Sequence, residues 1–117
     1  MFNEAVLDHF RNPRNAGDLP DPTAVVEVTN PVCGDVLKLS ARVEAGSIAA
    51  ASFKAQGCVA AIASSSALTE IMIGKSPQQL SRITANDISQ TLGGLPPTTL
   101  HAAQLCVDAL AALINKL

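Results

Sequence analysis

Four residues of the types that bind metal ions stand beside turn-forming residues in this sequence. Cys33 and Asp35 are separated by a single glycine in the stretch NPVCGD, and Cys58 follows a glycine directly. His101 comes just after the extended segment LPPTT and one leucine. Thiolate, imidazole and carboxylate together form the mixed sulfur, nitrogen and oxygen set that zinc or iron accepts. If the turns that carry these residues meet at one end of the fold, they form a metal site.

The spacing of these residues leaves other interpretations open. A single cysteine is more often a small buried apolar side chain than a ligand, and the intervals from 33 to 58 to 101 are far wider than those of paired Cys-x-x-Cys motifs. A cysteine enzyme is a third hypothesis, with Cys58 as nucleophile, His101 as base and Asp35 orienting that base. Cys106 falls within the apolar period of the last helix, so its default place is the core.

Composition narrows the class of protein. A chain of 117 residues fits one domain, 1–117. The formal net charge of −2 offers no electrostatic footprint for nucleic acid. The sequence MFNEAVLDHFRNPRNAG is not typical of a secretory signal. No uninterrupted apolar run reaches the roughly 20 residues of a membrane span. We therefore expect a cytoplasmic protein that binds neither nucleic acid nor membrane, whose three cysteines do not form a disulfide framework.

The periodicity of apolar residues predicts an α+β fold. Three segments with alternating apolar residues, 24–30, 35–45 and 47–56, are separated by turn-forming residues, which indicates a three-stranded antiparallel sheet. Helical spacing follows from Cys58 to the glycine at 74, and a long terminal helix begins near residue 100. Strands grouped before helices predict helices packed on one face of the sheet.

Three shorter helices complete the prediction. Asn3 is a candidate N-cap for a first helix, and Ser76 followed by a proline is a second such start. TANDISQTLGG predicts a short helix that ends at two glycines. The serines of ASSSA, residues 63–67, lack the surroundings of a nucleophile or a phosphate loop and are interpreted as small residues that allow close packing. We expect Asp8 and His9 to lie at the surface.

The sequence resembles the U-type iron–sulfur cluster scaffolds, the group of IscU and the NifU N-terminal domain. The resemblance covers nearly the whole chain through LDHFRNPRNAG, NPVCGD, FKAQGCVAAIASSSALTE, GKS and LPPTTLH, in that order. It implies a three-stranded sheet with packed helices that hold a nascent cluster, or zinc in its place, at one exposed end. The ligands that it implies are Cys33, Asp35, Cys58 and His101.

Two departures from the family pattern concern the site and its partners. The family usually carries a third ligand cysteine directly after the histidine, where the resemblance places acceptance of sulfur from a cysteine desulfurase, and this chain has Ala102 there. Cys106 lies about 6 Å further along the helix axis, so it replaces that cysteine only with a shifted cluster or a different helix register. The segment Leu95–Thr99 reads LPPTT where the family's Hsp70-type chaperone motif resembles LPPVK.

The resemblance favours a scaffold, not an enzyme. It implies that the chain assembles a labile cluster, [2Fe–2S] or iron on the way to it, and passes it to apo-proteins, with the Asp35 carboxylate weakening the hold on iron. The alternative is a zinc-binding regulatory or sulfur-transfer-accessory protein of the same fold that builds no cluster, which Ala102 favours.

Overall fold

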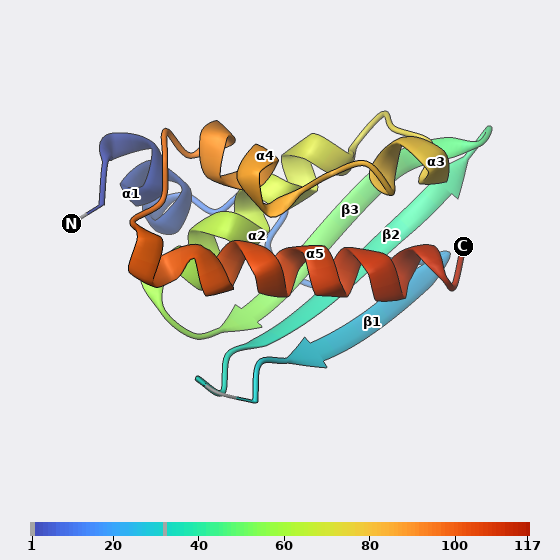
Figure 1. Cartoon of the computed structure of the whole chain (residues 1–117). Helices are drawn as coiled ribbons and strands as arrows, with labels where there is room; N and C mark the ends of the chain where they lie inside the picture. Colours follow the sequence, from blue (N-terminus) through green and yellow to red (C-terminus); the bar gives the residue numbers. More distant parts are fainter. Residues whose placement is uncertain (1, 32) are drawn as a thin grey trace.

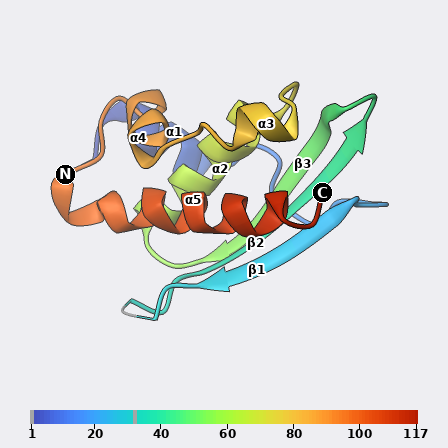
Figure 2. The same cartoon turned by 45° about the vertical axis from the view of Figure 1, so that its right-hand side comes forward.

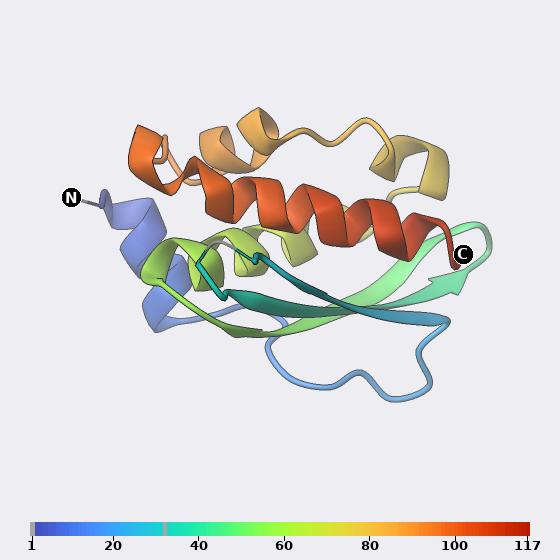
Figure 3. The same ribbon diagram turned by 60° about the horizontal axis from the view of Figure 1, so that its bottom comes forward.

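The fold consists of one sheet layer and one helical layer (Figure 1). The computed structural model describes residues 2–31 and 33–117. Strands β1 (Ala24–Thr29), β2 (Val36–Glu44) and β3 (Ser47–Gln56) form an antiparallel sheet in the order β1-β2-β3. Helices α2 (Val59–Met72) and α5 (Leu100–Ile114) lie across one face of it (Figure 3). The predicted fold class is confirmed.

The strands form where apolar residues alternate. Leu37, Leu39 and Ala41 of β2 are fully buried and share one face of the sheet, because side chains two residues apart on a strand point the same way. The β2–β3 connection is a two-residue turn, Ala45 and Gly46, and both residues have positive φ. That turn type matches the twist of a hairpin, so this turn and the buried alternation together fix the register.

The short helices begin at side-chain caps. Asn3 accepts a hydrogen bond from the Val6 amide at the start of α1 (Glu4–Arg11). Ser76 forms a reciprocal capping box at α3 (Pro77–Leu80), and Thr84 forms another at α4 (Ala85–Thr91). A 3-10 turn, η1 (Pro97–Thr99), leads directly into α5. The predicted caps at Asn3 and Ser76 are confirmed.

Helix α5 owes its apolar character to the core. Together with the 3-10 turn it gives 18 residues, Pro97–Ile114, of mean hydropathy 1.2, which passes the length and composition test for a membrane span. The expectation from the sequence concerned uninterrupted apolar runs of about 20 residues, and His101, Gln104 and Asp108 interrupt this shorter one. Its buried residues pack against α2 and the sheet, and they are Ala102, Ala103, Leu105, Cys106, Ala109, Leu110 and Leu113. A helix buried in this way is apolar without crossing a membrane.

The segment after α1 crosses the opposite face of the sheet (Figure 3). Asp18 lies 3.0 Å from Lys38 Nζ and 3.3 Å from Lys54 Nζ, and the two hydrogen bonds lower the pKa of its carboxyl group. The Phe53 amide donates to the Asn15 carbonyl, and Phe53 accepts from the Gly17 amide. These contacts cover part of the free edge of β3, which would otherwise present unpaired backbone groups.

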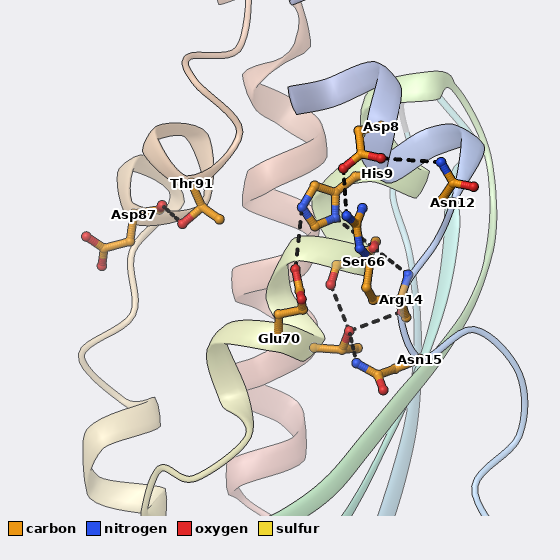
Figure 4. A network of polar contacts seen from close by, with 10 residues as sticks. Asp8, His9, Asn12, Arg14, Asn15, Ser66, Glu70, Asp87 and Thr91 are labelled. Carbon is orange, nitrogen blue, oxygen red and sulfur yellow. Dashed lines mark hydrogen bonds and ion pairs between the residues drawn. The ribbon is translucent and has the colours of Figure 1, made fainter. Parts of the chain in front are cut away.

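A buried network of polar contacts joins α1 to α2 (Figure 4). The sequence analysis did not predict this network. His9 is 7% exposed, not a surface residue, and its Nδ1 lies 2.8 Å from the hydroxyl of the fully buried Ser66. The same hydroxyl accepts a hydrogen bond from the Arg14 amide at 2.8 Å. The Ser66 hydroxyl thus links α2 both to α1 and to the segment after it, and burial lowers the pKa of His9. Asp8 is exposed, as predicted.

Three connections meet at one end of the molecule. The β1–β2 loop, the β3–α2 junction and the beginning of α5 all lie at the left in both Figure 1 and Figure 2. The C-terminus lies toward the other end. The predicted ligands are carried by these three connections, so the topology brings them to the same end.

Candidate metal centre

The β1–β2 loop is folded by its own backbone. The Asn30 amide donates to the Asp35 carbonyl at 2.8 Å, and the Gly34 amide donates to the Asn30 carbonyl at 2.7 Å. Gly34 has φ +73°, a conformation that a glycine adopts without strain. Cys33 is exposed on this turn, whereas Asp35 is only 5% exposed. The loop thus presents a thiol at the surface and a carboxyl group just beneath it.

Cys58 stands at the start of α2, where the chain leaves β3. It is the N-cap residue of that helix, and its side chain makes no capping hydrogen bond. The thiol is exposed, and its Sγ lies 3.9 Å from Asp35 Oδ2. The side chain of Cys58 is therefore exposed beside the Asp35 carboxylate, where it can act as a ligand.

His101 enters the site from the first turn of α5. Its Nδ1 lies 3.2 Å from the Thr98 carbonyl oxygen, so the Nδ1 proton is donated to that carbonyl. The other nitrogen, Nε2, lies 3.8 Å from Asp35 Oδ2. A ring nitrogen that donates to a backbone carbonyl while the other faces a site is the usual arrangement of a metal-binding histidine.

The structure brings the four predicted ligands together around Asp35. Ligand atoms of Cys33, Asp35 and His101 all lie within 4.8 Å of one another, and no ion is present in the structure. Cys58 joins this group through its 3.9 Å contact with the same carboxylate. One thiol, one carboxylate and one imidazole therefore form a compact group, and the second thiol, Cys58, contacts that group through the Asp35 carboxylate.

The spacing of these groups fits a metal ion. Neighbouring ligand atoms in a tetrahedral zinc site with bonds of about 2.0–2.3 Å are roughly 3.3–3.8 Å apart, close to the 3.8 and 3.9 Å seen around Asp35 Oδ2. Within the described residues, Cys58 is the one hydrogen-bond partner of the Asp35 side chain. A buried carboxylate with one such partner is suited to binding a cation, and the Nε2–Oδ2 separation exceeds the range of a direct hydrogen bond.

Cys106 is not brought to this site. It is fully buried, and its Sγ lies 3.7 Å from the hydroxyl of Ser65 in α2. Burial raises the pKa of the Cys106 thiol to about 12, so the thiolate that a metal requires is disfavoured there. Ala102, where the family carries its third cysteine, is also fully buried. Among the described residues, no third thiol reaches the site.

The geometry does not favour the enzyme hypothesis. A nucleophile and its base must lie within hydrogen-bond reach of each other. Within the described part of the chain, no hydrogen bond joins Cys58 to His101, and both of these side chains face Asp35. The contacts that the described residues show run from each of these side chains to Asp35 and not between Cys58 and His101.

The fold and the site together define a small α+β domain with a candidate metal site of thiol, carboxyl and imidazole groups at one end. The family model described as "NifU-like N terminal domain" matches residues 1–117, and the chain belongs to this family.

Curated relatives agree with that assignment, and a solved structure shares the fold. The chain is 44% identical to the iron–sulfur cluster assembly scaffold protein IscU of Aquifex aeolicus, over 97% of this chain and 74% of that protein. It is 41% identical to IscU 1 of Archaeoglobus fulgidus over the same shares. The structure of a SUF-system scaffold from Fervidobacterium islandicum superposes with a TM-score of 0.82 at 20% identity, and covers 97% of this chain and 96% of that one.

Proposed function

We propose that this protein is a scaffold on which an iron–sulfur cluster is assembled and then released to apo-proteins. The observation that carries the proposal is the convergence of Cys33, Asp35 and His101, with Cys58 beside them, at an exposed end of the fold. The names of the relatives support the same role. The role is that of a metal-binding scaffold, not of an enzyme.

The donor set is suited to temporary binding. Cys33 and Cys58 supply the thiolates that iron–sulfur clusters prefer, and both are exposed. The carboxylate of Asp35 is a harder ligand than a thiolate and binds iron of a cluster less strongly. The proposed cargo is a [2Fe–2S] cluster, or the iron from which it is built, and zinc is a substitute ion for the empty site.

The proposed partners follow from the cargo. A cysteine desulfurase is the proposed source of sulfur, and apo-proteins are the acceptors. The segment Leu95–Thr99 is proposed as a docking site for an Hsp70-type chaperone, because its two prolines, Pro96 and Pro97, restrict the backbone and so lower the entropic cost of binding. The expectation that the whole segment is extended is wrong, since Pro97–Thr99 form the 3-10 turn η1. We propose a cytoplasmic location, since three free cysteines suit a reducing compartment.

Anaerobic reconstitution tests the scaffold. Incubation of the protein with ferrous iron and sulfide is expected to give a brown chromophore, with iron and acid-labile sulfide bound in equal amounts. Cys33→Ala and Cys58→Ala should each abolish the colour, because each removes a thiolate. Cys106→Ala is the matched control and should retain it, because Cys106 is buried away from the site.

A zinc protein of the same fold is the second candidate, and Ala102 favours it, because no third thiolate reaches the site. It makes the opposite prediction in the same experiment. Tightly held zinc, together with no colour in the wild-type protein, would overturn the scaffold and support the zinc protein.

A further inference from the structure

The strand register places a glycine opposite the central carboxylate of the site. Val36 pairs with Gln56 at the end of the β2–β3 ladder, so the next position along each strand sets Asp35 against Gly57. Asp35 continues the helix-facing row of Leu37 and Leu39, since all three are two residues apart. The carboxylate therefore points into the helical layer and is buried, and Gly57 is its neighbour across the sheet.

The carboxylate occupies the space that a side chain at position 57 would need. A Cβ added to Gly57 would lie 2.5 Å from Asp35 Oδ1, 2.7 Å from Asp35 Cγ and 3.2 Å from the Cβ of Ala61. Carbon and oxygen do not approach to 2.5 Å without a bond. Of the seven glycines, all within the described chain, Gly57 is the one whose missing side chain is replaced by a residue of the metal site.

The carboxylate has little freedom to move away from such a Cβ. The backbone of Asp35 is held by the hydrogen bond from the Asn30 amide to its carbonyl, and by the strand that begins at the next residue. On its other side the carboxylate faces Cys58 Sγ and His101 Nε2 at 3.9 and 3.8 Å. A rotation that relieves the clash would therefore take Oδ2 out of the ligand group.

We infer that Gly57 is a positioning residue of the metal site: the absence of a side chain there keeps the Asp35 carboxylate between Cys58 and His101. This inference extends the proposed function, because it names the residue that sets the position of the oxygen ligand. It also explains why a glycine precedes the ligand cysteine of α2. The residue touches no metal itself and acts only through Asp35.

A double-mutant cycle with Co²⁺ as the probe tests this inference. Gly57→Ala should weaken Co²⁺ affinity about tenfold or more and change the Co²⁺ absorption spectrum to resemble that of Asp35→Ala. In the Asp35→Ala background the same change should cost less than about twofold, because the clashing atoms are gone. Equal losses in both backgrounds, or wild-type affinity in Gly57→Ala, would overturn the inference.

Backbone strain needs its own control, because Gly57 has φ +157° and Gly57→Ala is strained whatever the space. Gly74 has φ +90° and no atom within 4 Å of its added Cβ, so Gly74→Ala carries strain without a clash and should leave Co²⁺ affinity unchanged. If Gly57→Ala fails to fold, the double variant Asp35→Ala/Gly57→Ala is measured instead. A folded double variant supports the clash between residues 35 and 57, and an unfolded one overturns it.

The same double-mutant cycle is also measured on the stability of the metal-free protein. Gly57→Ala should lower the urea midpoint of the apo-protein more when residue 35 is Asp than when it is Ala. This arm depends only on the contact between the two residues. A wild-type protein that bound no Co²⁺ while showing this coupling would count against the proposed function and not against the contact, whereas additive effects in this arm would overturn the inference even if the metal binds.

Discussion

The three cysteines of this chain differ in the reactivity that we expect of their thiols, because two are exposed and one is buried. Cys33 and Cys58 are exposed at turns, whereas Cys106 is sealed between α5 and α2. A thiol reacts through its thiolate, so burial that raises the pKa of Cys106 to about 12 makes it inert near neutral pH. Reactivity should therefore divide the thiols as the metal site does.

Thiol counting measures this division. At pH 8, a disulfide reagent such as DTNB is expected to modify Cys33 and Cys58 rapidly in the metal-free protein. Cys106 should react only after unfolding in guanidinium, because its thiolate is both scarce and inaccessible. The variant Cys106→Ala should keep the two fast equivalents and lose the slow one. Three fast equivalents in the folded wild-type protein would show that Cys106 reaches solvent.

Among the elements, helix α1 depends on polar contacts that alternation and helical periodicity do not reveal. Its buried residues are Val6 and His9, and His9 reaches the hydroxyl of Ser66 on α2 (Figure 4). The sequence prediction placed His9 at the surface because no ligand cysteine stood near it. A signal was present in the three serines, residues 64–66, of an otherwise apolar helix. Buried hydroxyls need partners, and α1 with the segment after it supplies one for Ser66.

Acid should loosen this attachment. The groups that face His9 are Asp8, Arg14 and Glu70, and burial is the main reason that the pKa of His9 is lowered. The unfolded chain then binds a proton that the folded state resists, so the free energy of unfolding should fall as pH drops below about 6.5. Chemical denaturation between pH 7.5 and 5 measures this loss.

Substitutions at the two histidines test whether His9 causes the loss of stability in acid. His9→Gln should remove most of the loss in acid, because glutamine carries no titrating group. His101→Gln is the control and should leave the loss in place, because His9 is still present. An unchanged acid profile in His9→Gln would assign the loss to other groups.

For the molecule as a whole, periodicity and turn chemistry predicted the elements and their arrangement in a sheet covered by helices, whereas the positions of the site residues relative to one another required the structure. The strands, the long helices and the caps at Asn3 and Ser76 follow from local patterns that the structure confirms. The meeting of residues 33, 35, 58 and 101 depends on contacts across the whole chain, which spacing does not encode, so only the family resemblance predicted it. The close approach of Gly57 to Asp35 was not predicted, because it depends on the exact register of β2 and β3.

Because the ligands come from three connections, a bound ion should strengthen the entire fold. An ion that binds only the folded state adds RT ln(1 + [ion]/Kd), about 2.7 kcal/mol at one hundred times Kd. Zn²⁺ should therefore raise the free energy of unfolding of the wild-type protein by that amount in urea titrations. Cys33→Ala should lose most of this increment, because it removes a ligand of the β1–β2 loop. Cys106→Ala is expected to start from a lower stability, yet it should gain the full increment, since its sulfur lies in the core. If Zn²⁺ stabilises Cys33→Ala as much as the wild-type protein, then zinc binds elsewhere and the site that contains Cys33 is not the zinc site.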